Sequence, residues 1–201
     1  MKTKPLLVFT ISLMLALIGW VQFFPGPFFR VVDRLESYPD LKFLHIFTVT
    51  LFYANAVIGT LWEARGLLSR DLPIIRHTYR TVTFLDATFT APLILVAAFS
   101  GILLARLYGG IWTIGWVSTA LTLFLGSGIF WLVADIPTQY RVRRAFERVP
   151  VDVTEVPSEL QRLLWLRLAI NIASLLPLTV VFYLMVHKPE MRTVGRVLGW
   201  P

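Results

Sequence analysis

The sequence predicts an all-α fold, a polytopic membrane helix bundle with five transmembrane helices. Three observations support this prediction. Hydrophobic residues make up 56% of the 201 residues and charged residues 15%, whereas soluble domains carry about 25% charged residues. The mean hydropathy of the chain is +0.69. Five apolar runs, each close to the length of a bilayer span, recur along the chain without the alternating pattern of a β-barrel strand.

The first apolar run covers residues 5–24 and follows Lys2 and Lys4. It resembles a signal peptide, but no small-residue cleavage motif follows its core, and it is long enough to cross a bilayer. We therefore predict an uncleaved anchor helix. In residues 25–40, apolar positions at helical spacing alternate with charged ones, which indicates a short helix lying in the membrane interface. Residues 1–40 thus form an N-terminal anchor and interfacial segment.

Residues 41–201 are predicted to form a four-helix membrane core, with helices over residues 41–63, 81–107, 111–134 and 163–186. These runs must be helical because lipid offers no hydrogen-bond partner to a backbone amide or carbonyl. Pro92 and Pro177 lack an amide N–H and are expected to kink their helices. Between the helices, we expect cytoplasmic loops at residues 70–80 and at about 135–162, the one sizeable polar segment.

The basic residues between the helices indicate the orientation of the chain. A cytoplasmic N-terminus places eleven Lys and Arg residues on the inner side and seven on the outer side. The inner residues are Lys2, Lys4, Arg65, Arg70, Arg76, Arg80, Arg141, Arg143, Arg144, Arg148 and Arg162, and the outer ones are Arg30, Arg34, Lys42, Arg106, Lys188, Arg192 and Arg196. Because cytoplasmic loops are enriched in Lys and Arg, we expect the N-terminus in the cytoplasm.

The composition also restricts the kinds of function. Cysteine is absent, which excludes disulfides, zinc–thiolate sites, iron–sulfur clusters and cysteine nucleophiles. The net charge of +7 is distributed mostly between apolar runs, a pattern typical of loops at an anionic membrane surface and not of a nucleic-acid-binding face. No P-loop, dinucleotide fingerprint, serine elbow or zinc-binding helix occurs. These observations favour a non-enzymatic protein but leave the question open.

Two histidines are candidate cofactor ligands. His45 is expected near the outer end of its helix, and His187 at a similar depth at the end of the last helix. Neutral imidazole is a good iron ligand, so the pair is a candidate set of axial ligands for haem b. The favoured alternative is that both hydrogen-bond water or lipid headgroups at the interface. His77 is expected in a solvated loop.

Five polar residues are candidates for an intramembrane network: Asn55, Glu63, Arg80, Asp86 and Asp135. An unpaired carboxylate inside a bilayer costs roughly 2.5–3.5 kcal/mol on insertion scales, so each acidic side chain must be paired, protonated or facing water. The favoured interpretation is an interhelical salt-bridge network that fixes packing. The alternative is a proton relay or a substrate-binding site.

Three segments carry a resemblance to a known family: LKFLHI at residues 41–46, DATFTAP at residues 86–92 and LMVHKP at residues 184–189. They look like the bacterial predicted integral membrane proteins grouped as domain of unknown function 2269. The resemblance covers residues 41–189 and implies a four-helix core in the bacterial inner membrane, with residues 1–40 as an addition. It implies no particular activity.

A more distant similarity is to HemJ-type protoporphyrinogen oxidases and CopD-type copper-resistance membrane proteins, which also open a helix with a histidine in an apolar setting. In HemJ-type enzymes this histidine is implicated in haem b binding, together with a lysine on a later helix. His45 matches the histidine, and the resemblance implies that it is a haem ligand. The last three predicted helices contain no lysine, which is a departure from that pattern.

The favoured function is therefore a non-catalytic subunit or accessory factor of a larger membrane complex, with the lipid bilayer and other membrane subunits as partners. The alternative is a haem-b-binding membrane redox protein with His45 as an axial ligand. A third hypothesis is a small proton-coupled transporter that uses Glu63, Asp86 and the inner basic residues.

Overall fold

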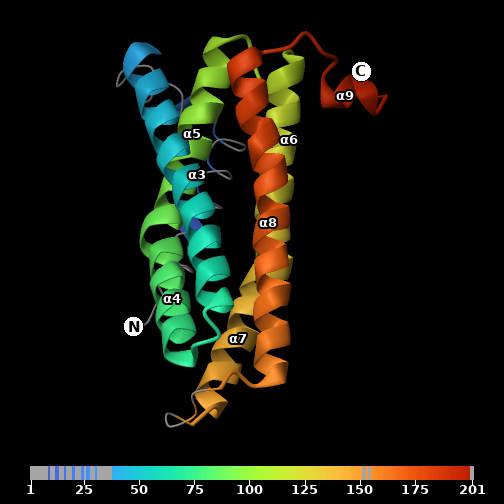
Figure 1. Ribbon diagram of the computed structural model, residues 1–201. Coiled ribbons are helices and arrows are strands. Elements are labelled where there is room, and N and C mark those ends of the chain that lie inside the picture. Colours follow the sequence, from blue (N-terminus) through green and yellow to red (C-terminus); the bar gives the residue numbers. More distant parts are fainter. Residues whose placement is uncertain are drawn as a thin grey trace. The chain divides into compact units, whose positions relative to one another are not determined.

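The computed structural model (Figure 1) describes residues 38–150, 153 and 155–199, and before them Phe9, Ser12, Leu13, Ala16, Trp20, Phe24, Gly26, Pro27 and Arg30. Throughout this described part the regular structure is helical and contains no strand, so the all-α prediction is confirmed. Among the described residues, four helical segments are long and apolar enough to cross a membrane: Tyr38–Leu68, Leu72–Leu107, Gly115–Arg148 and Ser158–His187. Most of the anchor helix predicted at residues 5–24 and most of the interfacial segment lie outside the described residues.

The first described span is α3, Tyr38–Leu68, which contains the predicted helix 41–63. It ends where Arg70 adopts a left-handed backbone with φ 56°. The next helix, α4 (Leu72–Leu85), follows after only three residues, and the Asp71 carboxylate accepts a hydrogen bond of 3.0 Å from the Ile74 amide in its first turn. The connection from α3 is therefore a tight turn.

The loop predicted at residues 70–80 is thus largely helical, and that prediction was wrong. The buried residues of α4 are Leu72, Ile75, Tyr79 and Val82, spaced three or four apart, so one face of the helix packs inward. Arg76 and Arg80 lie on its other faces. Because apolar and basic residues are mixed in this segment, its average hydropathy is that of a loop, and the helical spacing of its apolar residues was overlooked.

The second and third spans share an unusual feature, a π-helical turn that ends two residues before a proline. In the second span, η1 (Asp86–Thr90) joins α4 to α5 (Ala91–Leu107), and Pro92 is the second residue of α5. In the third, η2 (Trp131–Asp135) joins α6 (Gly115–Phe130) to α7 (Ile136–Arg148), with Pro137 second in α7. A proline ring clashes with the carbonyl four residues earlier in an α-helix, and here that carbonyl lies in the wider π turn.

The polar segment predicted as a loop at about 135–162 is also mostly helical. Helix α7 continues to Arg148, and α8 (Ser158–His187) begins earlier than the predicted residue 163. Only residues 149–157 connect the two helices. Thr138 and Val142 are the buried residues of α7, whereas its arginines face outward, so the average polarity concealed this helix too. The cytoplasmic side of the segment stays a prediction.

The last span, α8, runs without interruption past Pro177 and ends at His187, because the next residue, Lys188, has a left-handed φ of 46°. The chain then folds back over the start of α6 before the short helix α9 (Val194–Val197). The Val194 amide donates to the Ser118 hydroxyl at 3.1 Å. A Cβ added to Gly115 would lie 1.8 Å from the Met191 carbonyl oxygen, so only glycine permits this close backbone approach.

The chain divides into two compact units. Unit 1 comprises Met1–Asn55 and Thr83–Tyr108, and unit 2 comprises Ala56–Val82 and Gly109–Pro201. The described core of unit 1 contains Leu41, Leu103 and Leu104. Unit 2 holds two clusters, one of Leu67, Leu72, Ile75, Tyr79, Val142, Leu160, Leu164 and Leu168, the other of Ala120, Val181 and Leu184. Within unit 2, α6 lies along α8 (Figure 1).

Candidate functional site

Unit 2 contains a buried cluster of charged side chains, in which Arg167 on α8 bridges two carboxylates. Its Nη2 and Nε lie 3.0 and 3.1 Å from Oε1 of Glu63 on α3. Its Nη1 lies 3.0 Å from Oδ1 of Asp135 in η2. The residues are 1%, 0% and 3% exposed, respectively. One guanidinium therefore ties α3 and η2 to α8.

The second oxygen of each carboxylate accepts a hydrogen bond from a carboxamide. Asn171 Nδ2 donates to Glu63 Oε2 at 2.5 Å, and Gln139 Nε2 donates to Asp135 Oδ2 at 2.7 Å. Asn171 is one helical turn beyond Arg167, and Gln139 one turn beyond Asp135, so helical geometry presents each pair on one face. All four carboxylate oxygens thus accept N–H donors, and no buried side-chain polar atom in the described residues lacks a partner.

Aromatic and apolar side chains lie beside the cluster. The Arg167 guanidinium lies 5.6 Å from the centroid of the Tyr79 ring, within the range of a cation–π interaction. The Tyr79 hydroxyl donates to the Leu164 carbonyl at 3.5 Å, and Leu164 and Leu168 are buried beside Arg167 on α8. Low polarity around an ion pair strengthens it but makes an unpaired charge costly. Removing any one charged side chain of the cluster is therefore expected to destabilise the packing around it.

Of the five polar residues predicted as a network, unit 2 brings Glu63 and Asp135 together. Arg80, also in unit 2, is exposed on α4, and Arg167 is the cation on both carboxylates. Sequence reasoning missed Arg167, Asn171 and Gln139. A signal was present, since an arginine within an apolar run of membrane length requires a buried anionic partner.

Asn55 and Asp86 belong to unit 1. The Asn55 amide donates to the Thr90 hydroxyl at 2.6 Å, which ties α3 to the end of η1. Asp86 is the first residue of η1 and is half-buried. The predicted five-residue network is thus divided between the two units.

His45, in unit 1, packs against α5 with a defined orientation. Its Nδ1 lies 3.1 Å from the Ala97 carbonyl and 3.1 Å from the Ser100 hydroxyl. The Ser100 hydroxyl itself donates to the Val96 carbonyl at 2.6 Å. Since a carbonyl only accepts, the hydrogen bond to Ala97 requires the proton on Nδ1, and in the neutral ring Nε2 then keeps its lone pair. A Cβ added to Gly101 would lie 2.9 Å from His45 Cε1, so this glycine makes room for the ring.

The other two histidines are exposed and belong to unit 2. His187 ends α8, where Nδ1 lies 3.1 Å from the Tyr183 carbonyl and the ring stacks on Tyr183 with centroids 4.1 Å apart. His77 lies on α4, in the segment predicted as a solvated loop. A haem held by His45 would have to bind through Nε2, and this role of His45 stays a prediction. In residues that the structure describes, no group of three or more His, Cys, Asp or Glu side chains could hold a metal ion.

A family model described as "Predicted integral membrane protein (DUF2269)" matches residues 40–189. The chain belongs to this family. The match begins in the first turn of α3 and ends just beyond α8, so it covers all four apolar spans, His45 and the charged cluster of unit 2. The resemblance seen in the sequence is thereby confirmed, and the protein is a multi-pass integral membrane protein.

No curated protein and no solved structure matches the chain. The description of the family as predicted integral membrane proteins supplies a location in a membrane and no reaction. The more distant similarity to HemJ-type and CopD-type proteins stays a prediction from the sequence. The features that bear on function are therefore the charged cluster of unit 2, the surroundings of His45 and the surface of the spans.

Proposed function

We propose that this member of the family is a non-catalytic subunit or accessory factor of a larger membrane complex. The observation that supports this most directly is the exposure of Gly126 and Gly128 in the apolar stretch of α6. A Cβ added to either would meet nothing within 4 Å among the described residues. Glycine weakens a helix, and in membrane helices it is retained where another helix approaches closely. A transmembrane helix of another subunit would use this opening.

The charged cluster of unit 2 is consistent with such a role. Arg167 uses three nitrogens on two carboxylates, and these contacts fix the packing of helices instead of leaving a guanidinium free for a substrate. In a subunit, rigid packing of this kind would keep the lateral surface in one shape for a partner helix.

Cross-linking from α6 tests the proposal. Because the chain has no cysteine, Gly126→Cys and Gly128→Cys each introduce a single attachment point for a photoactivatable cross-linker. Leu176→Cys is the matched control, since Leu176 is 66% exposed on α8. We expect a covalent adduct with another membrane protein from positions 126 or 128 but not 176, and the same protein should co-purify in fixed ratio in mild detergent. A clean monomer with an activity of its own would refute the proposal.

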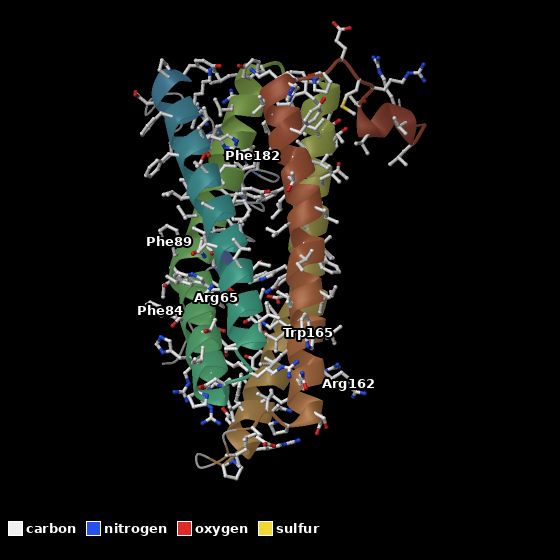
Figure 2. The ribbon with its side chains drawn as sticks, viewed as in Figure 1. Arg65, Phe84, Phe89, Arg162, Trp165 and Phe182 are labelled. Atoms are coloured by element: carbon white, nitrogen blue, oxygen red, sulfur yellow. The ribbon has the colours of Figure 1, made fainter. Side chains whose placement is uncertain are left out.

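The placement in the bacterial inner membrane, with a cytoplasmic N-terminus and a fifth span at residues 5–24, is part of the same proposal. Exposed arginines of unit 2 lie at or near the helix ends beside its leucine-rich core: Arg65, Arg70, Arg141, Arg143, Arg144, Arg148 and Arg162. Arg80 is exposed within α4. Arg162 and the exposed Trp165 lie one turn apart on α8 (Figure 2). Such a basic end, next to an interfacial tryptophan, supports a cytoplasmic location for it.

Single cysteines also test this orientation. Ser69 and Glu190 are both exposed, and they follow α3 and α8, respectively. A membrane-impermeant maleimide should label Glu190→Cys in intact cells, and Ser69→Cys only after the cells are broken. The reverse pattern would invert the orientation.

A second candidate function is haem b binding with His45 as an axial ligand. The supporting observation is that the Ala97 carbonyl holds Nδ1–H and thereby leaves Nε2 as the ligating atom, the usual arrangement of metal-binding histidines. Haem would supply one-electron chemistry, and His45 would hold the iron. The absorption spectrum of the purified protein, oxidised and reduced, decides this. A missing Soret band when haem supply is ample, or an unchanged spectrum in His45→Ala, would eliminate the candidate.

A further inference from the structure

The charged cluster of unit 2 marks the level at which two apolar spans end. Residues 115–134, which precede Asp135, and residues 168–186, which follow Arg167, contain no charged side chain. Each run is about 28–30 Å long at a rise of about 1.5 Å per residue, close to the thickness of the hydrocarbon layer of a bilayer. Arg167 Nη1 lies 3.0 Å from Asp135 Oδ1, so both spans leave the hydrocarbon at one level of unit 2.

Two exposed tryptophans lie beside the cluster at this level. Trp62 on α3 is 47% exposed and Trp165 on α8 is 46% exposed, and tryptophan is enriched where lipid headgroups begin. Each has an exposed arginine three residues farther from the apolar run of its helix, Arg65 after Trp62 and Arg162 before Trp165 (Figure 2). Residues three apart share a helix face. Each arginine is therefore placed next to a tryptophan, on the side away from the hydrocarbon.

Exposed arginines from four helices of unit 2 surround its leucine-rich core near this level. They are Arg65 on α3, Arg80 on α4, Arg141 on α7 and Arg162 on α8, and we call them the arginine band. Arg65, Arg141 and Arg162 lie ~3, ~9 and ~8 Å along the helix axis from the cluster residue of their own span. Arg80 follows Tyr79, whose ring centroid lies 5.6 Å from the Arg167 guanidinium. The headgroup layer is about 5–8 Å thick on each side of a bilayer, and arginine side chains reach back toward it.

The arginine band is not neutralised by the protein in its described part. None of its four arginines forms an ion pair with a described carboxylate. The exposed acidic residues at this end of unit 2 all lie farther from the apolar runs than the band: Asp71, Glu147, Glu155 and Glu159. Arg76 differs, because it is half-buried and donates to the carbonyls of Phe146 and Val149 at 3.4 and 3.3 Å. The band therefore presents positive charge outward at the level of the headgroups.

We propose that the arginine band binds the phosphate groups of anionic phospholipids, with Trp62 and Trp165 placed against the glycerol region of the same lipids. A guanidinium matches a phosphate with two parallel hydrogen bonds. The neighbouring tryptophans and the end of the apolar runs favour a lipid as the source of the phosphate over a soluble anion. This inference does not depend on the subunit role, because lipids at the helix ends leave the faces of the spans free.

Native mass spectrometry of the full-length protein in detergent, titrated with short-chain phosphatidylglycerol, tests this inference. Short-chain phosphatidylcholine is the comparison without net charge. Each arginine near an anionic surface contributes about fivefold to binding, so the wild type should bind phosphatidylglycerol at least about tenfold more tightly than phosphatidylcholine. A variant that combines Arg65→Gln, Arg141→Gln and Arg162→Gln should lose at least about tenfold in affinity for phosphatidylglycerol. It should stay folded, because the three side chains are exposed.

The matched control combines Arg70→Gln, Arg144→Gln and Arg148→Gln, which removes the same charge from exposed residues farther from the apolar runs. Its affinity should change by no more than about threefold, since attraction falls off over about 10 Å in salt solution. Equal losses in the two triple variants, or equal affinities of the wild type for the two lipids, would overturn the proposal.

Two further measurements complete the test. Millimolar inorganic phosphate should not displace phosphatidylglycerol, and displacement would show a site for free anions instead of lipids. If the band variant folds poorly, the three single substitutions decide, and each should lower the affinity about fivefold. Unchanged affinity in all three single variants would contradict the proposal.

Discussion

His45 in unit 1 and Arg167 in unit 2 are both polar side chains on apolar helices, yet they differ in their hydrogen-bond partners. Arg167 places Nε, Nη1 and Nη2 on the carboxylates of Glu63 and Asp135, so its nitrogens hold helices together. His45 places Nδ1 on the Ala97 carbonyl, and what remains is the lone pair of Nε2. Burial alone therefore does not identify the kind of ligand. The hydrogen-bond partners are more informative: a neutral imidazole bonded through Nδ1 leaves Nε2 for a metal, whereas a guanidinium held by two carboxylates fixes the packing of helices.

The comparison also predicts where stability depends on polar contacts. In unit 2, removal of one charge exposes another inside an apolar core, so substitutions should have large effects on folding. In unit 1, the His45 ring is half-buried and makes hydrogen bonds to neutral groups, so substitutions should cost less. Four substitutions test this contrast.

The largest effect is expected from Arg167→Met, which leaves Glu63 and Asp135 buried without a cation. Breaking a buried ion pair by removing one partner costs about 3–5 kcal/mol. We expect little folded protein in the membrane and a strongly lowered melting temperature in detergent. Arg162→Met is the control, because Arg162 is exposed one turn from Trp165 on the same helix. Equal stability of Arg167→Met and the wild type would show that the charged cluster does not hold unit 2 together.

The next effect is expected from Gly115→Ala in unit 2. The new Cβ would lie 1.8 Å from the Met191 carbonyl oxygen, and backbone must move to relieve the contact. Overpacking of this kind costs about 3 kcal/mol at the upper end of the usual range. Thermal unfolding of the purified protein measures it. Gly126→Ala, with nothing within 4 Å of the new Cβ, is the control and should be neutral or stabilising by up to about 1 kcal/mol. Equal melting temperatures would contradict the prediction.

A smaller effect is expected from Gly101→Ala in unit 1. Its Cβ would lie 2.9 Å from His45 Cε1. The imidazole ring can rotate away from the new methyl group, which the backbone near Gly115 cannot do as easily. We expect a loss of about 1 kcal/mol, measured by thermal unfolding, together with displacement of the ring from Ala97. If haem b is bound through His45, its absorption bands should weaken in the same variant. A loss as large as that of Gly115→Ala would remove the predicted difference between the two glycines.

The smallest effect is expected from Ser100→Ala. This change removes one neighbour of Nδ1, but the Ala97 carbonyl still accepts its proton at 3.1 Å. The loss of one neutral hydrogen bond costs about 1 kcal/mol. His45 should keep its tautomer, which nitrogen-15 NMR of the labelled histidine can verify. A shift of the proton to Nε2 would show that Ser100, and not the carbonyl, determines the tautomer.

The boundaries of the helices show what could be read from the sequence. The apolar cores of all four described spans were predicted, because about twenty consecutive apolar residues leave a chain few alternatives in a bilayer. Helices α4 and α7 were missed as extensions of these spans. Their charged residues lie on exposed faces and give each segment a polar average hydropathy. The helical spacing of apolar residues such as Ile75 and Tyr79 was therefore not used to predict a helix.

The candidate site was only partly predictable. Glu63 and Asp135 were recognised because an acidic residue next to an apolar run needs a partner. The basic residue included in the predicted network was Arg80, whereas the structure pairs both acids with Arg167. His45 was recognised by its place in an apolar helix, whereas the carbonyl that orients its ring could not be foreseen. Backbone acceptors such as that of Ala97 carry no signal in the amino-acid type.

The helical structure, the location in a membrane and the membership of a family of integral membrane proteins follow from the amino-acid sequence, since span length, apolar composition and family motifs are local properties of the chain. Which charges meet depends on the packing of the helices. Arg167 contacts carboxylates 104 and 32 residues away in the sequence. Charge pairing across such distances depends on which helix faces pack together, and many arrangements of the same helices would satisfy the same hydrophobic pattern.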